Sequence, residues 1–252
     1  MSVDLALDGA VAIITLNRPE RKNAFTREQY DAFAAHLDSI AGRDDVHVAV
    51  VTGAGGSFSS GQDLKEMAEL ATAASSRSAA TADATDSSGT GTGFTVLLDA
   101  LQRFPKPLLA AVEGVAVGIG MTLLPYCDIV VVAESTRMRV PFSELGVPPE
   151  AGSSALLADL VGWQRAAEIL LTSRWVSSSE AVDFGLALEK VGDGRALERA
   201  TEIARTIADK SPYSTGVIKR LMVAARGSRS TEARAREEAL FTELFRGGGY
   251  GG

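Results

Sequence analysis

The sequence predicts a layered α/β domain followed by a helical C-terminal region. Short apolar, β-branched runs recur in the first half of the chain. Glycine-containing turns follow several of these runs, and amphipathic helical stretches fill the chain from about Ala151 onward. A chain of 252 residues is long enough for one large domain or two small ones.

The N-terminal elements begin with two strands. Val3–Asp8 and Val11–Asn17 are apolar or alternating, and Asp8-Gly9 between them is typical of a hairpin turn. A helix follows, in which Thr26 and Gln29 have the spacing of a capping box. Val46–Thr52 is a short β-branched run and predicts a buried strand. This order of elements is typical of the start of a layered α/β domain.

A long segment of small residues interrupts the pattern. After the glycine–serine loop Gly53–Gly61, a helix is expected over Asp63–Leu70. Ala71–Gly93 contains only Ala, Ser, Thr, Gly, Asp and one Arg, so it cannot contribute to a core, and we expect a mobile insert there. A helix resumes at Phe94 and stops before Pro105.

The second half repeats the order of strand, glycine turn and helix, which predicts a stack of related ββα units. Leu108–Val112 and Asp128–Ala133 are expected to be buried strands, and Glu113–Gly120 to turn into a helix that runs through Leu124. Six helices are expected after that, the third capped by Ser177 and Glu180. They are Gly152–Leu160, Arg165–Leu171, Ser178–Phe184, Arg195–Ala208, Pro212–Ala225 and Thr231–Phe245.

Composition argues against several classes of protein. The net charge of −7 does not favour nucleic acid or anionic membranes as partners. The single cysteine, Cys127, cannot form an intramolecular disulfide, and the two histidines have no ligand-like spacing, so no metal site is expected. No run of about 18 apolar residues predicts a membrane span, and neither end carries a targeting signal, so we expect a cytoplasmic protein.

Common catalytic motifs are missing as well. The sequence has no G-x-x-x-x-G-K-[ST] phosphate loop and no G-x-S-x-G elbow. Gly118-Ile119-Gly120 lacks the third glycine of a dinucleotide fingerprint, because Leu123 stands where it would be needed. A phosphate-loop enzyme, a serine hydrolase and an NAD enzyme are therefore disfavoured.

Two glycine turns that each lead into a helix remain as candidates. They are Gly61-Gln62-Asp63 and Gly118-Ile119-Gly120. Such turns present free backbone N–H groups, and two of them together can stabilise one oxyanion. Each turn taken singly is equally explained as a tight strand-to-helix corner.

Charged residues supply two further candidates. Pro148 and Pro149 block helix ahead of Glu150 and helix follows, so we expect Glu150 in a rigid first helical turn. The alternative for Glu150 is an ordinary acidic residue that complements the helix dipole. Arg21 and Lys22 form a small basic pair that is either a site for an anion or a solvated surface pair.

Six sequence blocks in order resemble the enoyl-CoA hydratase/isomerase (crotonase) superfamily over about Val3 to Val223. They are NRPERKNA (17–24), SFSSGQDLKEM (57–67), PKPLLAAVEGVAVGIG (105–120), CDIVVVAES (127–135), PFSELGVPPEAGSS (141–154) and SSEAVDFGL (178–186). The resemblance implies a ClpP-like crotonase spiral of ββα units over residues 1–195, with the insert at 71–93. It also implies a helical C-terminal trimerisation region over residues 196–252, acyl-CoA thioester substrates and an enolate held by two backbone N–H groups.

The resemblance also assigns site residues. The amides of Gln62 and Ile119 would form the oxyanion hole. Coenzyme A, as part of the substrate and not a separate cofactor, would contact Arg21, Lys22, Ala24, Asp63 and Leu64, and the substrate would contact Gly118 and Phe142. A homotrimer or a dimer of trimers is expected, without nucleic acid or membrane as a partner.

The position of acidic residues separates the reactions of the superfamily. Hydratases carry two acids, at positions held here by Thr122 and Phe142, which counts against hydration. Glu150 stands where the Δ3,Δ2-enoyl-CoA isomerases carry their single catalytic glutamate, which favours that isomerisation in fatty acid metabolism. Glu144 in the same loop is an alternative acid. The other readings are a hydratase, another one-acid crotonase reaction such as thioester hydrolysis, and an acyl-CoA binding protein without turnover.

Overall fold

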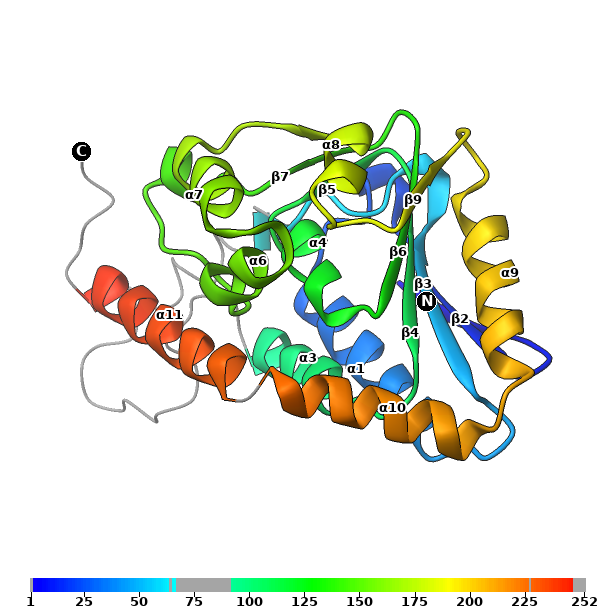
Figure 1. Cartoon of the computed structure of the whole chain (residues 1–252). Coiled ribbons are helices and arrows are strands. Elements are labelled where there is room, and N and C mark those ends of the chain that lie inside the picture. The colour runs from blue at the N-terminus through cyan, green and yellow to red at the C-terminus, as the bar shows by residue number, and fades with distance from the viewer. Residues whose placement is uncertain (1, 64, 67–91, 227, 247–252) are drawn as a thin grey trace.

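The computed structural model describes residues 2–63, 65–66, 92–226 and 228–246, and within these it has the predicted α/β architecture (Figure 1). A six-stranded sheet has the order β1-β2-β3-β4-β6-β9 and is parallel except for the antiparallel β1–β2 hairpin. Its strands are β1 (Val3–Asp8), β2 (Val11–Leu16), β3 (Val48–Gly53), β4 (Leu108–Val112), β6 (Ile129–Ala133) and β9 (Glu189–Val191).

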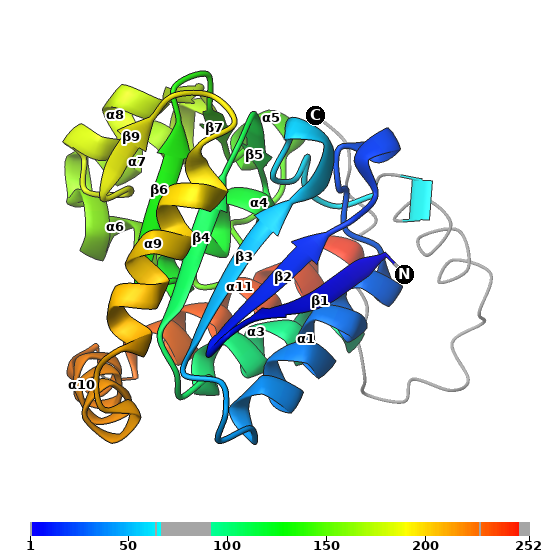
Figure 2. The same ribbon diagram turned by 90° about the vertical axis from the view of Figure 1, so that its right-hand side faces the viewer.

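Helices cover both faces of this sheet, because its central strands are apolar on both sides. Along β3, Val48 and Val50 face α9 (Ala196–Ala208), whereas Ala49 and Val51 face the core that contains α1 (Arg27–Ala41) and α3 (Thr92–Arg103). Figure 2 shows α9 on one side of the sheet and α1 with α3 on the other. The continuous apolar runs of the sequence thus follow from burial on both faces.

A second, smaller sheet was not predicted. It has the order β5-β7-β8 and consists of β5 (Val115–Val117), β7 (Arg137–Arg139) and β8 (Val176–Ser177). Strands of two or three residues are too short to leave a hydrophobic period in the sequence. β5 therefore intervenes where the sequence predicted one continuous turn into α4 (Ile119–Thr122).

The predicted helices after residue 151 are confirmed. They are α6 (Ser153–Val161), α7 (Trp163–Thr172), α8 (Ser178–Asp183), α9, α10 (Pro212–Ala225) and α11 (Arg229–Arg246). Two short helices, η3 (Leu124–Tyr126) and α5 (Phe142–Leu145), precede them and are not among the six predicted helices. Both capping boxes are also confirmed: Thr26 and Gln29 begin α1, and Ser177 and Glu180 begin α8. These elements form where local capping chemistry and apolar spacing agree.

The boundary of the predicted insert was wrong at its C-terminal end. α3 begins at Thr92, and Gly93 lies within it against α1, where a Cβ would come 3.0 Å from the Asp31 carboxylate. The absence of a side chain at Gly93 lets α3 lie close to α1, which the sequence alone could not show. The rest of the insert, like most of the helix expected over Asp63–Leu70, lies outside the described residues.

The C-terminal helices differ in how they contact the core. α10 is fixed by Lys219, a buried residue whose ammonium contacts the Asp128 carboxylate at 2.9 Å and donates to the Lys106 carbonyl at 2.8 Å. α11 packs against α6. None of the helices in the described part of the chain has both the length and the apolarity needed to cross a membrane.

Candidate active site

Two glycine turns from distant parts of the sequence lie in contact. Gly61 has φ +96°, and a Cβ on it would lie 2.9 Å from the carbonyl oxygen of Val117, so no side chain fits there. Gly118 has φ +52°, and a Cβ on it would lie 3.8 Å from the Cα of Gly61. Both positions therefore require glycine, one for its close contact and both for their left-handed backbone.

The residues that follow these glycines present unused backbone amides. Gln62 forms a bridge with Phe25, in which Phe25 donates to Gly61 and Asp63 donates to Phe25, so that the Gln62 N–H points the other way. Ile119 is the first residue of α4, whose internal hydrogen bonds begin at Met121. Neither the Gln62 nor the Ile119 N–H has an acceptor among the described residues. Two free donors on adjoining turns are what binding of an oxyanion requires.

Glu150 lies beside these turns. A Cβ on Gly118 would come 4.0 Å from Glu150 Oε1, so the carboxyl group is next to the Gly118 turn. The expected place of Glu150 in the first turn of a helix was wrong, because α6 begins only at Ser153 and Ala151 and Gly152 both have positive φ, of 60° and 69°. Glu150 is thus held by an irregular turn that precedes the helix.

The carboxyl group of Glu150 is poorly compensated. It has no hydrogen-bond donor within the ranges that the structure describes, and although the residue as a whole is half-buried, its carboxyl end is desolvated. This burial, followed by the nearby charge of Glu237, raises the pKa of Glu150 from 4.5 to about 8. A carboxylate with such a pKa is a stronger base than an exposed glutamate.

A tyrosine holds the side chain of Gln62. The fully buried Tyr30 of α1 donates to Gln62 Oε1 at 2.5 Å, and its ring stacks on Phe25 at 4.9 Å. Burial, together with the charges of Glu150 and then Glu66, raises the pKa of Tyr30, so the hydroxyl remains a donor. The pattern of the sequence gives no signal for this role of the Tyr30 hydroxyl.

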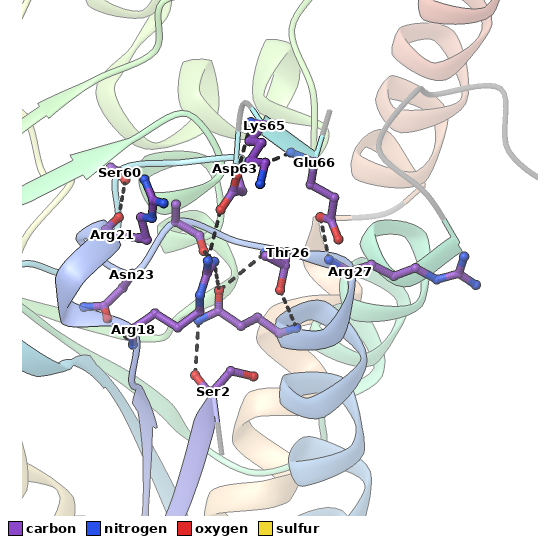
Figure 3. A network of polar contacts seen from close by, with 12 residues as sticks. Ser2, Arg18, Arg21, Asn23, Thr26, Arg27, Ser60, Asp63, Lys65 and Glu66 are labelled. Carbon is purple, nitrogen blue, oxygen red and sulfur yellow. Dashed lines mark hydrogen bonds and ion pairs between the residues drawn. The ribbon is translucent and has the colours of Figure 1, made fainter. Parts of the chain in front are cut away.

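An arginine ties the Gln62 turn to the loop before α1, as Figure 3 shows. Arg18 donates to the Ala24 carbonyl at 2.7 Å and forms an ion pair with Asp63 at 3.1 Å. Although burial acts in the opposite direction, the hydrogen bond from Arg18 and the backbone donors of Glu66 and Lys65 lower the pKa of Asp63. Arg18 was not among the predicted site residues, although it belongs to the first block of the resemblance.

The predicted coenzyme A residues lie around the same turn. Arg21 and Lys22 are exposed, and Ser60, just before Gly61, donates from its amide to the Lys22 carbonyl and from its hydroxyl to the Arg21 carbonyl. These two bonds attach the basic pair next to Gly61, and Figure 3 shows the one between Ser60 and Arg21. Ala24 is buried. Its carbonyl accepts a hydrogen bond from the Arg18 guanidinium, and its amide donates to the Arg21 carbonyl. Leu64 lies outside the described residues.

The residues expected to separate the possible reactions differ in burial and in their partners. Thr122, at the end of α4, is buried, and its hydroxyl has no partner in the described part of the chain. Phe142 is buried at the start of α5. Glu144, the alternative acid, is exposed and pairs with Arg139. Glu150 thus has the desolvated carboxyl expected of a base, whereas the carboxylate of Glu144 forms an ion pair with Arg139 at the surface.

The described residues contain no group of three or more metal-binding side chains. Cavities of about 500 Å³ between α3 and α11 and about 460 Å³ beside α9 are lined by other residues than Gln62, Ile119 or Glu150. The site is therefore built on backbone donors and one carboxyl group, and neither cavity contains these groups.

Comparisons with known proteins identify the family of this chain. The family model for enoyl-CoA hydratase/isomerase matches residues 7–248. The 1,2-epoxyphenylacetyl-CoA isomerase of Escherichia coli K12 is 31% identical over 219 residues, covering 87% of this chain and 80% of that protein. Enoyl-CoA hydratase EchA19 of Mycobacterium tuberculosis is 32% identical over 235 residues, covering 92% and 82%.

One more relative and one solved structure are also similar to this chain. Enoyl-CoA delta isomerase 2 of Rattus norvegicus is 35% identical over 218 residues, covering 85% of this chain and 52% of that protein. The structure of Pseudomonas aeruginosa OdaA aligns with a TM-score of 0.86 at 32% identity, covering 97% of this chain and 94% of that one. The fold and these similarities define a crotonase-type enzyme that acts on an acyl-CoA. The chain belongs to the enoyl-CoA hydratase/isomerase family.

Proposed function

We propose that the protein is a Δ3,Δ2-enoyl-CoA isomerase, which converts 3-enoyl-CoA to trans-2-enoyl-CoA. The observation that carries the proposal is the desolvated carboxyl of Glu150 beside two amides that have no acceptor among the described residues. By the resemblance, the two hydratase acids would stand at Thr122 and Phe142, and both of these residues are buried. Hydration needs one group to activate water and another to supply a proton. A 1,3 proton shift needs only one group.

The proposed chemistry balances with that one group. Glu150 removes a proton from C2, and the electrons of the C2–H bond pass to the thioester oxygen, giving a dienolate. The amides of Gln62 and Ile119 stabilise that oxygen. Glu150 then returns the proton to C4. The electrons on the oxygen re-form the C1–O double bond, the C1–C2 double bond of the dienolate moves to C2–C3, and the electrons of the C3–C4 double bond form the new C4–H bond. The raised pKa of Glu150, about 8, suits this use because the same group must accept and donate the proton.

The test compares the wild type with Glu150→Gln on 3-enoyl-CoA and on crotonyl-CoA. We expect isomerase activity in the wild type, with kcat/KM rising with pH as Glu150 ionises around pH 8, and loss of at least about 1,000-fold in the variant while acyl-CoA binding persists. Hydration of crotonyl-CoA should be weak or absent. Unchanged turnover in the variant would remove Glu150 from the mechanism, and efficient hydration by the wild type would favour a hydratase.

The other readings give different results in the same assays. An enzyme that hydrolyses the thioester would release free coenzyme A, detected with a thiol reagent. An acyl-CoA binding protein would bind tightly and convert no enoyl ester.

We also propose that the chain assembles as a homotrimer or a dimer of trimers. α10 exposes four large apolar side chains, Tyr213, Ile218, Leu221 and Met222, more than a solvated helix usually carries. Light scattering coupled to size-exclusion chromatography gives the mass, and a monomer at micromolar concentration would contradict this proposal.

A further inference from the structure

The C-terminal helix reaches the turn that carries Glu150. Glu237 of α11 is buried, and its carboxylate accepts hydrogen bonds from the amide of Gly152 at 2.6 Å and from the amide and hydroxyl of Ser154 at 2.9 and 2.5 Å. These donors lie two and four residues after Glu150. α11 also packs along α6, whose first turn contains Ser154 (Figure 1). Glu237 thus joins two segments that lie more than 80 residues apart in the sequence.

The turn needs such support because its backbone is unusual. Ala151 has φ +60°, a conformation that an L residue rarely adopts, and Gly152 has φ +69°. From the opposite side, the hydroxyl of Tyr126 in η3 donates to the Ala151 carbonyl at 2.8 Å. The turn is therefore held between η3 and α11, and the direction of the Glu150 side chain depends on both contacts.

Glu237 acts on Glu150 through its charge as well. After burial, the charge of Glu237 is the second cause of the raised pKa of Glu150. Burial also raises the pKa of Glu237, but its three hydrogen-bond donors act in the opposite direction and favour its charged form. Glu150 has no such donors in the described residues. Of the two carboxyl groups, Glu237 is therefore the one that ionises first, and Glu150 holds its proton longer.

Other ionisable groups surround the pair. Glu238, on the same helix, raises the pKa of Glu237 further. Arg234 of α11 is buried and pairs with Asp99 of α3 at 2.9 Å. Burial raises the pKa of Tyr126; the positive charge of Arg234 acts against this increase, and the charge of Glu237 adds to it. On the α1 side, burial raises the pKa of Tyr30, and the charge of Glu150 raises it further. Glu237 is the group whose charge contributes to the raised pKa of Glu150, and the others act on its neighbours.

We propose that Glu237 is a positioning residue for the Glu150 base, because its carboxylate holds the turn that carries Glu150 and places a second negative charge beside it. The inference rests on the proposed function only in treating Glu150 as the base. In this arrangement α11 completes the active site of its own chain without contacting the reacting atoms.

The test uses Glu237→Gln in the full-length chain, with Glu243→Gln on an exposed position of the same helix as the matched control. The amides of Gly152 and Ser154 donate to different oxygens of Glu237, so glutamine, which has one acceptor oxygen and no charge, loses one of these two bonds. In protein labelled with 13C at glutamate carboxyls, the Glu150 resonance is the one absent from Glu150→Gln. We expect its titration midpoint to fall by about one pH unit in Glu237→Gln and to stay unchanged in Glu243→Gln.

Kinetics supply a second measurement. For Glu237→Gln we expect kcat to fall about 10-fold with KM within about 2-fold, because the base is misdirected while substrate contacts remain. Glu237→Asp keeps the charge but shortens the reach, so kcat should fall while the titration midpoint of Glu150 stays near that of the wild type. If Glu237→Gln does not fold, the kcat of Glu237→Asp tests the inference, and a lower kcat than that of the wild type supports it.

The outcomes separate this inference from the proposed function. A native-like Glu237→Gln with unchanged midpoint and unchanged kcat would overturn the inference, as would wild-type kcat in Glu237→Asp. A shifted midpoint in a protein that does not isomerise 3-enoyl-CoA would contradict the proposed reaction and leave the link between Glu237 and Glu150 standing.

Discussion

Replacing Glu150 by glutamine should make the protein more stable at alkaline pH. The raised pKa means that the native state keeps the Glu150 proton between pH 4.5 and about 8, whereas the unfolded chain has released it. The free energy of unfolding therefore falls as pH rises through this window and is level above it. At about 1.4 kcal/mol per pKa unit, the shift from 4.5 to about 8 corresponds to a loss on the order of 5 kcal/mol.

Glutamine cannot ionise, so Glu150→Gln lacks this loss. Differential scanning calorimetry of both proteins from pH 5 to pH 9 measures the effect. We expect similar melting temperatures near pH 5 and an advantage of roughly 10 °C for the variant at pH 9. Glu243→Gln, which removes an exposed carboxyl from α11, serves as the control and should melt in parallel with the wild type. Parallel curves for Glu150→Gln would refute the argument that the Glu150 carboxyl is desolvated.

Two further predictions concern the turn and the basic pair. Gly118→Ala should lower kcat about 100-fold or more, because there is room for a Cβ but the backbone at φ +52° does not suit alanine, so the Ile119 amide moves. The control is Gly9→Ala, at φ +58° in open space, which should cost similar stability and leave kcat unchanged. Equal kcat values in the two variants would contradict this prediction. Replacing Arg21 and Lys22 together by serine should raise the KM for an acyl-CoA about 10-fold, because two positive charges that would contact its phosphates are lost. Initial rates should show no such increase for the acyl-pantetheine thioester, which lacks the nucleotide phosphates. Equal KM values for the acyl-CoA in wild type and variant would exclude a role of this pair in binding the phosphates.

The conflict between catalysis and stability at Glu150 has a physical origin. A carboxyl is a better base when water is kept from it, but the same desolvation makes its ionised form costly in the folded state. The surrounding residues do not lower this cost, but they fix the position of the carboxyl group. Tyr126 and Glu237 hold the turn, and Arg18 holds the neighbouring turn through Asp63.

Much of the fold could be predicted because its signals are local. The strand 108–112 and the helix 212–225 have the predicted bounds, since apolar runs and a Ser-Pro start act over a few residues. The strands at 115–117 and 137–139 could not be predicted, because three residues carry too little pattern and pair only through the surrounding fold. The start of α3 was missed for a related reason, since Gly93 depends on contact with α1.

The sequence by itself determined the family, the two glycine turns and the candidate acid, because each is a short run of residues whose chemistry is independent of distant neighbours. Only the tertiary structure brought Gly61 against Gly118 and Glu150 beside them, and only it revealed the hydroxyl of Tyr30 and the carboxylate of Glu237 as partners of the site. A hydrogen bond acts over about 3 Å, so partners 32 or 85 residues apart are determined by how the helices pack and not by their spacing in the chain.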